Sequence, residues 1–526
     1  MTGRGVYSSV VLIAVGVYFN SLGGDLVHDD IVALARNQDV LGGTSVGQMF
    51  TNDFWGTPLS DPASHKSYRP LTTLTFRLTN CMFGLEPVWL HACNVLLHAL
   101  SCVLFTRLSF AVAGLSRKFS AVAGILFAVH PIHSDAVTSI VGRADVLACA
   151  LFLLSFLFYH DSGFRSKSRG RLAISIIFAV LSMLAKETGI TVLMVNLLYD
   201  FYKYHSAVKR YSGFRSKSRG RLAISIIFAV LSMLAKETGI TVLMVNLLYD
   251  FYKYHSAVKR KSRHLCFALA KSQSVNLSIL CNALGSYNKK INRVFRQFCF
   301  SDDSRFLTFS YLAVFNFWLL LCPSTLSHDW FLTFSYLAVF NFWLLLCPST
   351  LSHDWQMGSI PLVTNLADSR NLATCAFFGC CLLLLYRCLS DLENPRHSPL
   401  FLGVLLLVIP FLPASNMLVT VGFVVAERVL YIPSLGFILL ITHGLQIISH
   451  SGYLRRKLLI GAILMLVVAH SMKTMDRNKD WSSRESLARA GLQSLPENAK
   501  MHYNFANVLH SQNQTESAIY HYRRAL

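Results

Sequence analysis

The sequence is built from long apolar runs that contain almost no charge. Residues 146–159, VLACALFLLSFLFY, are one such run, since none of their side chains is charged. Runs of this kind are typical of helices in a lipid bilayer. Only 14% of the 526 residues are charged, whereas soluble domains carry about 25%. The pattern predicts an all-α polytopic membrane protein. It excludes disordered and disulfide-rich proteins, and also nucleic-acid binders, although the net charge is +21.

Short basic connections give the apolar segments a direction, because Lys and Arg accumulate in the cytosolic loops of membrane proteins. SRK at 116–118, FRSKSRGR at 164–171 and LRRK at 454–457 are basic connections. The long connection 23–86 is rich in Asp, so we expect it on the non-cytosolic side. Assigning the connections to the two sides of the membrane from the N-terminus and, independently, from the C-terminus gives consistent results. The residues after 470 are then also non-cytosolic. The expected membrane segments are 6–22, 87–114, 119–132, 144–159, 171–185, 188–202, 399–412, 429–447 and 458–470.

Two segments of the chain occur twice without a single change. Residues 162–210 recur at 212–260, and residues 306–330 recur at 331–355. Natural structural repeats diverge while they keep their packing pattern. Identical neighbouring copies therefore indicate a recent exon duplication or an inexact gene model, and we expect the second copies to be silent. The parity of membrane crossings between 261 and 356 stays open. Either one copy of the shorter repeat does not span, or a weak apolar segment after residue 264 does.

The C-terminal residues 499–526 follow the spacing of a tetratricopeptide repeat. Residues 481–498 are then a linker that follows a membrane domain at 1–480. One repeat cannot bury its own apolar face, so we expect this repeat to be incomplete. Asn513 begins an Asn-Gln-Thr glycosylation sequon. The residues that occupy the repeat positions are Ala499, His502, Phe505, Ala506, Leu509, Ala518, Tyr522 and Ala525.

The polar clusters of the membrane domain all fall on one side of the predicted topology. Ionisable residues at the ends of membrane helices are costly and usually face a site or a partner. Any one cluster is also compatible with an ordinary interfacial loop, but together they predict one non-cytosolic cavity. The clusters are HDD at 28–30, HKSYRP at 65–70, HPIHSD at 130–135, GRAD at 142–145, AKET at 185–188 and AER at 426–428.

Asp29 and Asp30 are adjacent carboxylates just after the first apolar segment. Neighbouring carboxylates repel each other, which can raise the pKa of one of them toward the range of a general base. A helix cap or a polar turn is the alternative interpretation of the pair. We predict Asp29 and Asp30 as the catalytic residues of the cavity.

Four cations in the same clusters could hold a phosphate leaving group, since Arg binds phosphate oxygens in a bidentate manner. Local ion pairs and helix capping are the alternative roles for these residues and for the histidines nearby. The sequence contains no Cys/His spacing of a metal site, so no metal-ligating residues are predicted, and the metal requirement stays open. The predicted donor-binding residues are Arg69, His130, His133, Asp135, Arg143, Lys186, Glu187, Glu427 and Arg428.

Several motifs, in order along the chain, give it a family resemblance. They include VHDD, FTNDFWG, SHKSYRPL, HACNVLLH, LFAVHPIHSDAV, VGRADVLA, AKETG, RNLAT, PASN and VGFVVAERVLYIPSLGF. Together with the C-terminal repeat they resemble the transmembrane and tetratricopeptide repeat-containing (TMTC) protein O-mannosyltransferases. The resemblance covers nearly all of the chain apart from 261–305.

This resemblance implies a GT-C glycosyltransferase fold in the endoplasmic reticulum membrane, with the repeat in the lumen. It implies transfer of mannose from dolichyl phosphate mannose to Ser and Thr hydroxyls of acceptor proteins, among them cadherin-type domains. The family's first-loop acidic motif falls on Asp29 and Asp30, one of which would deprotonate the acceptor hydroxyl. The reaction would invert the anomeric carbon, so that the β-linked donor gives an α-mannoside. The implied partners are a lipid-linked donor and acceptor proteins, with no tightly bound cofactor and no nucleic acid.

Two other function classes stay open from the sequence. A polytopic transporter also places charged side chains in membrane helices and often contains internal repeats. A catalytically silent scaffold would use only its lumenal repeats to bind a partner. The duplications also leave open whether this particular chain is an active enzyme, an inactive form of one, or the product of a mispredicted gene model.

Overall fold

The computed structural model describes residues 3–162, 169–212, 328–355, 358–391, 398–416, 421–450 and 452–526. These residues are helical, and within them the only β-type pairs are two isolated bridges, Asn52 with Pro58 and Trp355 with Val425. The predicted all-α class is therefore confirmed. Apart from residues 212 and 328–330, the second copy of the longer duplication and the first copy of the shorter one lie outside the described residues, as does the segment that follows residue 264.

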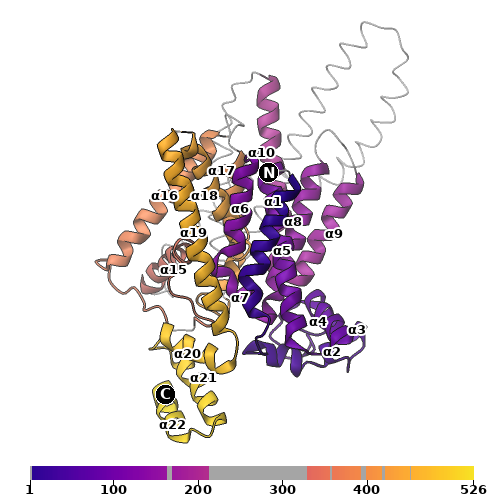
Figure 1. The fold of residues 1–526 in the computed structure, drawn as a ribbon, viewed down its shortest axis with the longest axis vertical. Coiled ribbons are helices and arrows are strands. Elements are labelled where there is room, and N and C mark those ends of the chain that lie inside the picture. The colour runs from indigo at the N-terminus through magenta and orange to yellow at the C-terminus, as the bar shows by residue number, and fades with distance from the viewer. Residues whose placement is uncertain are drawn as a thin grey trace, which may run out of the picture. The chain divides into compact units, whose positions relative to one another are not determined.

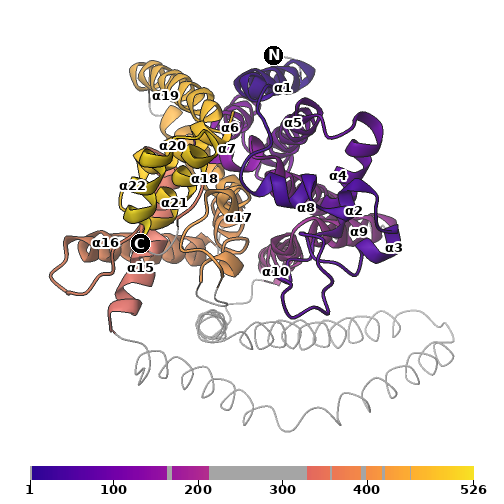
Figure 2. The ribbon, with the colours of Figure 1, turned by 90° about the horizontal axis from the view of Figure 1, so that it is seen from below.

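The N-terminal half forms one group of long helices (Figures 1 and 2). Helix α5 packs against α1, α6 and α8, and α8 packs against α9. Each helix overlaps one of the predicted apolar segments, although α10 continues from the predicted end at 202 to Ser212. Pro87 stands at the first turn of α5, where the missing amide N–H costs nothing. These helices are α1 (Gly3–Tyr18), α5 (Pro87–Ala111), α6 (Arg117–Val129), α8 (Arg143–Ser162), α9 (Arg169–Ala185) and α10 (Thr191–Ser212).

The C-terminal half contributes a second group of helices. Gly436 of α18 meets α17 so closely that a Cβ there would lie 2.3 Å from the carbonyl oxygen of Gly403. Only glycine permits this approach of two helix backbones. The helices are α15 (His328–Leu346), α16 (Ser369–Asp391), α17 (Ser398–Val408), α18 (Pro433–Ser449) and α19 (Tyr453–Asp480).

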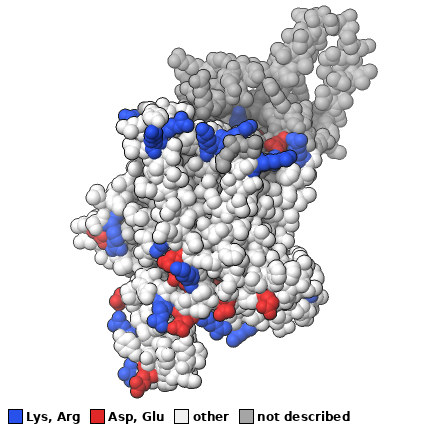
Figure 3. Space-filling view, viewed as in Figure 1, with Lys and Arg blue, Asp and Glu red and all other residues white. Residues whose placement is uncertain are grey.

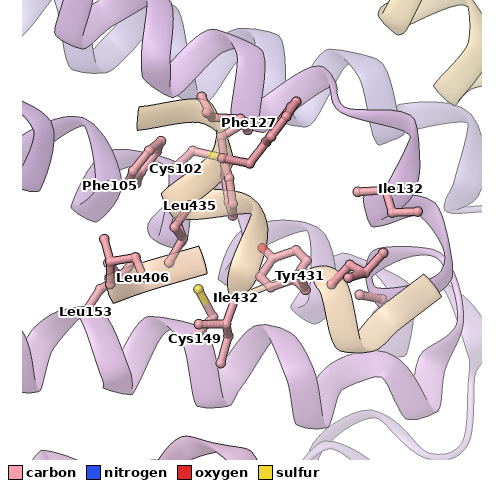
Figure 4. Close-up of a cluster of buried hydrophobic side chains, with 14 of the residues drawn as sticks. Cys102, Phe105, Phe127, Ile132, Cys149, Leu153, Leu406, Tyr431, Ile432 and Leu435 are labelled. Atoms are coloured by element: carbon pink, nitrogen blue, oxygen red, sulfur yellow. The ribbon is translucent and has the colours of Figure 1, made fainter. Parts of the chain in front are cut away.

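Both groups share one buried core, part of which is drawn in Figure 4. Side chains from α5, α6, α8, α17 and the start of α18 meet there. Because segments from both ends of the chain fill this core, neither half could be removed without exposing the other. The labelled residues, all 5% exposed or less, are Cys102, Phe105, Phe127, Ile132, Cys149, Leu153, Leu406, Tyr431, Ile432 and Leu435.

The described part of the chain contains four helices that are long and apolar enough to cross a membrane, or five if one bent pair counts as a span. Only 6% of the apolar stretch of α16 and of α19 is buried against protein, so both helices offer apolar surface to lipid. Figure 3 shows a broad uncharged band, with Lys and Arg along one end and both signs of charge at the end that carries α20–α22. The chain is a multi-pass membrane protein. Helices α9, α15, α17 and α18 are also apolar, but their apolar stretches contain only 10–17 residues.

Helices α6 and α19 begin at the same end of the bundle. Their far ends meet, since the Thr474 hydroxyl donates to the Val129 carbonyl over 2.8 Å. The basic residues at 116–118 and 454–457 lie at the first turns of the two helices and therefore lie at one end. This agrees with the predicted sidedness, in which both basic connections share one side.

The connection 23–86 is less irregular than the sequence indicates. It contains the π-helical turn η2 (Ile31–Ala35), the short helices α2 (Gln38–Leu41) and α3 (Val46–Met49), and the longer α4 (Pro70–Phe83). Polar side chains hold the turns together, and Asp53 accepts hydrogen bonds from the amides of Trp55 and Thr57 over 3.0 Å each. The connection is thus a folded unit on the bundle.

The predicted linker 481–498 contains helix α20 (Arg484–Ser494). Ser483 and Ser486 form a reciprocal capping box at its start, a local signal for a helix N-terminus. Helices α21 (Ala499–Ser511) and α22 (Thr515–Ala525) follow as an adjacent pair. Their small core contains Ala488, Phe505, Leu509 and Ala518. Helix α20 therefore covers part of the apolar face that one repeat cannot bury alone.

The described copy of the shorter duplication is the second one, at 331–355. Its helix α15 places Leu337, Leu344 and Leu345 in the main core, with at most 6% of each exposed. In the structure this second copy is therefore part of the packed core, and whether the duplications are silent stays a prediction.

Candidate functional site

Asp30 is a buried structural carboxylate. It is 0% exposed, and its two oxygens accept hydrogen bonds from the amides of Val141 over 2.9 Å and Val27 over 3.2 Å. Burial raises the pKa of Asp30 to about 7, and the charge of Asp29 adds to that rise as a smaller cause. One member of the pair thus has the raised pKa that the sequence predicted, but burial is the main reason. Asp30 fastens the loop after α1 to the turn η4 (Ile140–Gly142).

Asp29 is the accessible member of the pair, with 27% of its side chain exposed. Its Oδ2 lies 3.5 Å from Nη2 of Arg428, and its Oδ1 lies 3.5 Å from Nε2 of His28. His28 has a left-handed backbone with a φ of 49°, which is uncommon for a residue with a side chain. This turn places Asp29 beside a cation while Asp30 points into the protein.

The backbone amide of Arg428 is held by a hydrogen bond, so the position of the residue does not depend on its guanidinium group. It lies in the turn η8 (Glu427–Leu430), and its amide donates to Oδ2 of Asp135 over 3.2 Å. Asp135 lies in the short helix α7 (Ser134–Val137) and is 4% exposed. The side chain of Arg428 is 32% exposed. The structure therefore brings three of the predicted residues, Asp29, Asp135 and Arg428, into one cluster.

Lys186 and Arg69 add positive charge beside this cluster. The ammonium of Lys186 pairs with Asp145 over 2.5 Å in a buried contact. Arg69 pairs with Glu187 over 3.3 Å at a more exposed position. Burial lowers the pKa of Lys186, Asp145 opposes this effect, and the charges of Arg69 and Arg428 lower that pKa further. The charges of Arg69 and Arg428 thus both act on Lys186.

Arg143 occupies a different environment. It is 1% exposed, and its guanidinium donates to the Asn94 side chain, the Leu90 carbonyl and the Thr79 hydroxyl over 2.8 to 3.1 Å. It also stacks over the Phe76 ring at 4.3 Å. All of these partners are internal, so Arg143 holds α4, α5 and α8 together and has no free edge for a phosphate.

His130 and His133 are buried as well, at 2% and 0% exposure. Both ring nitrogens of each histidine lie within hydrogen-bonding distance of protein atoms. His133 contacts the Phe127 carbonyl and the Ser434 hydroxyl, each at 2.8 Å. His130 contacts the Leu345 carbonyl at 3.0 Å and the Ile132 amide at 3.3 Å. These contacts favour the capping and packing roles over sugar binding.

Glu427 is fully buried beside Arg428. Its Oε1 accepts hydrogen bonds from the Ser352 amide over 2.5 Å and from the Trp355 indole N–H over 3.1 Å. Burial raises the pKa of Glu427 to about 8, so its carboxyl holds a proton at neutral pH. These contacts join η8 to the loop after α15.

Three further residues border the cluster and were missed by the sequence analysis. Arg477 and Trp481 lie at the end of α19, and His353 lies in the loop after α15. The predicted last membrane segment ended at residue 470, which left the polar stretch after it without an assigned role. A single Arg embedded near the end of a membrane helix was the signal that could have pointed to Arg477. Within the described ranges, no group of three or more His, Cys, Asp or Glu side chains could hold a metal ion.

Sequence comparison relates the chain to a named family. A family model described as "Protein O-mannosyl-transferase TMTC, DUF1736" matches residues 298–332 and, separately, residues 331–382. The human protein named "Protein O-mannosyl-transferase TMTC1" is 39% identical over 97% of this chain and 53% of its own length. The human TMTC4 protein is 33% identical over 97% of this chain and 64% of its own length. The chain thus spans about half the length of the TMTC1 relative that it matches.

Among solved structures, an archaeal oligosaccharyltransferase, AglB from Archaeoglobus fulgidus, is similar with a TM-score of 0.43 and 12% identity, over 93% of this chain and 56% of that chain. That structure contains an inhibitory peptide and a dolichol-phosphate. The sequence relationship is much stronger. The continuous likeness to TMTC1 over 97% of this chain, together with the matched family model, makes the chain similar to the TMTC proteins along nearly its whole length.

Proposed function

We propose that the chain is a protein O-mannosyltransferase of the GT-C type, which transfers mannose from dolichyl phosphate mannose to Ser and Thr hydroxyls. The observation that carries this proposal is the accessible Asp29 carboxylate at 3.5 Å from Arg428, with Lys186 and Arg69 close by. A base beside several cations suits a hydroxyl nucleophile and a phosphate leaving group. The names of the TMTC relatives support the same reaction.

In this mechanism Asp29 accepts the proton of the acceptor hydroxyl. The hydroxyl oxygen then forms a bond to the anomeric carbon, on the face opposite the phosphate. The bond between that carbon and the phosphate oxygen breaks, and its electron pair leaves with dolichyl phosphate. The β-linked donor becomes an α-mannoside, and Asp29 later releases its proton to water.

The cations stabilise the charge that develops on the leaving phosphate. Arg428 is the main candidate, since its guanidinium is partly exposed and its backbone is fixed by Asp135. Arg69 and Lys186 add to the positive field, while Glu187 and Asp145 fix their positions. Preorganised charges of this kind need no rearrangement during the reaction. Asp30 has a positioning role, because it fixes the loop that carries Asp29.

We place the site in the lumen of the endoplasmic reticulum, together with the tetratricopeptide-like helix pair α21 and α22 and the helix α20 that precedes it. The shared basic end of α6 and α19 supports a cytosolic position for that end. The acceptors would be secretory proteins that pass through the lumen, including those with cadherin-type domains.

A transfer assay with the chain in microsomes tests the proposal. With radiolabelled dolichyl phosphate mannose, we expect label on Ser or Thr of an acceptor domain, sensitive to α-mannosidase. Arg428→Gln should lower the transfer rate by about 10²- to 10³-fold, the usual effect of losing one group that stabilises developing charge. Arg370→Gln is a matched control, because Arg370 also pairs with a carboxylate, Asp368, over 2.6 Å but has no assigned role. Wild-type rates for Arg428→Gln would contradict the phosphate role, and absence of label with wild type would contradict the function.

The sequon at Asn513 tests the orientation. Asn513 lies in the exposed turn between α21 and α22, with a φ of 62°. If this end is lumenal, we expect an N-linked glycan that endoglycosidase H removes and that Asn513→Gln abolishes. A C-terminal tag should also resist protease in sealed microsomes. Digestion of the tag without detergent would place these helices in the cytosol and overturn the orientation.

A further inference from the structure

Several buried polar atoms near the proposed site have no hydrogen-bond partner. In native proteins most buried polar groups are paired with protein or ordered water, so a group of unpaired atoms calls for an explanation. Arg477 is 4% exposed, Trp481 2%, Ser352 1% and Glu427 0%. The unpaired atoms among these side chains and His353 are Nε and Nη2 of Arg477, Oε2 of Glu427, Oγ of Ser352, Nδ1 of His353 and Nε1 of Trp481.

These side chains belong to one neighbourhood. The charge of Arg477 acts on both Glu427 and His353. Glu427 accepts the amide hydrogen bond of Ser352, the residue next to His353. The ring of His353 lies 6.4 Å from that of Trp481, centroid to centroid. Residues from η8, the loop after α15 and the end of α19 thus converge.

The same neighbourhood borders the proposed catalytic residues. The rings of His353 and His28 meet edge to face at 5.1 Å, and His28 contacts Asp29. Asp135, which holds the backbone of Arg428, also interacts with the charge of Arg477. The partly exposed side chains of His28, Asp29 and Arg428 form the open edge. A ligand part placed here would lie next to the leaving phosphate.

The unpaired atoms include both donors and acceptors. Nη1 of Arg477 is held by Asp480 over 2.8 Å, which leaves the Nε and Nη2 edge to donate two parallel hydrogen bonds. Oε2 of Glu427 and Oγ of Ser352 can each accept a hydrogen bond, and the hydroxyl and a protonated carboxyl can also donate. Phosphate oxygens mostly accept hydrogen bonds, whereas sugar hydroxyls donate and accept. The mixed set therefore matches neighbouring hydroxyl groups of a sugar better than a phosphate.

We propose that Arg477, Glu427 and Ser352, with the rings of His353 and Trp481, bind the hydroxyl groups of the mannosyl residue of the donor. This inference rests on the proposed function, because the sugar is the one carried by that donor. In it, Arg428 and its neighbouring cations bind the phosphate, and Arg477 selects the sugar. The two parts of the donor are then recognised by different side chains.

Two lipids separate the two parts of the site: dolichyl phosphate mannose and dolichyl phosphate, which lacks the sugar. We expect Arg477→Gln to weaken binding of the mannosylated lipid to the purified chain by about 10- to 100-fold, since hydrogen bonds to a charged group are lost. Binding of dolichyl phosphate should change less than about twofold. Arg428→Gln should weaken binding of both lipids. Arg489→Gln is a control, because Arg489 forms an exposed ion pair with Glu485 on α20, and should affect neither.

Ser352→Ala is the least disruptive variant. The hydroxyl that it removes has no protein partner, while the backbone amide that holds Glu427 is kept. We expect an unchanged melting temperature and binding of the mannosylated lipid that is about 2- to 10-fold weaker. This variant keeps the test valid even if Arg477→Gln fails to fold, since a structural role would not produce a loss confined to one lipid.

Other outcomes separate the inference from the function on which it rests. Equal losses for both lipids in Arg477→Gln would assign Arg477 to the phosphate and overturn the sugar role. No change for either lipid in both variants would mean that the unpaired atoms hold only water. In both cases the proposed function stands if the wild-type chain binds the mannosylated lipid and transfers mannose. Failure of the wild-type chain to bind either lipid would overturn the proposed function itself.

Discussion

Replacing Asp29 with Asn should lower the rate of mannose transfer by about 10²- to 10⁴-fold, the range for loss of a general base. Asn keeps the size of the side chain but cannot accept the hydroxyl proton. The change removes one ion pair on a partly exposed side chain, so the fold should be kept. The measurement is the initial rate of label transfer at saturating donor, with donor binding measured in parallel. A rate within threefold of wild type would exclude Asp29 as the base.

Asp30→Asn is the matched comparison, and it should keep most of the transfer rate. Its signature lies in stability. Burial raises the pKa of Asp30 to about 7, whereas an Asp carboxyl in the unfolded chain has a pKa of about 3.9. Between these values the folded protein holds a proton that the unfolded chain has lost, so wild-type stability falls as pH rises from about 4 to 7. The Asn variant should show a smaller fall in its melting temperature, because the buried Glu427, whose pKa is raised to about 8, still contributes a fall of its own. Loss of transfer in Asp30→Asn with donor binding and fold intact would assign the base to Asp30.

Replacing Asp145 with Ala should destabilise the protein by about 3–5 kcal/mol, because Lys186 would keep a buried charge without a partner. The side chains of the pair are only 6% and 7% exposed. The measurement is thermal or denaturant unfolding of the purified chain in one detergent. A loss below 1 kcal/mol would mean that water reaches Lys186.

Two comparisons support that measurement. The double variant Asp145→Leu with Lys186→Met removes both charges together, and its stability should be close to or above that of wild type. Glu485→Ala breaks an exposed pair with Arg489, whose side chain is 58% exposed, and should cost less than about 1 kcal/mol. The double variant should still lose transfer activity if Lys186 supports the phosphate, which separates stability from function.

The helices of the membrane domain were largely predictable from the sequence. The apolar segment 87–114 became α5, and the basic connections gave α6 and α19 the shared direction that the structure has. These features depend on local composition, which a sequence displays directly. The helix in the predicted linker was missed because α20 has few apolar residues, although the capping serines at 483 and 486 were visible.

The roles of single residues were less predictable. Asp29 and Asp30 are neighbours of the same type, and they differ because the Val141 amide, 111 positions away, meets Asp30. Arg143 and Arg428 carry the same guanidinium, yet one is enclosed by α4 and α5 while the other faces Asp29. Such differences arise from tertiary contacts. Residue type and order cannot reveal them.

The end of α19 is tied to the rest of the protein on several sides. Asn478 bonds to the hydroxyl of Thr138 and to the carbonyl of Val17, and the Asp25 amide donates to the Ser482 carbonyl. Lys500 of α21 pairs with Asp354 over 2.6 Å. Helices α20 and α21 are therefore held at a fixed distance from Asp29. For an acceptor held on them, the spacing between its docking segment and its hydroxyl would select the modified residue more than the sequence around that hydroxyl.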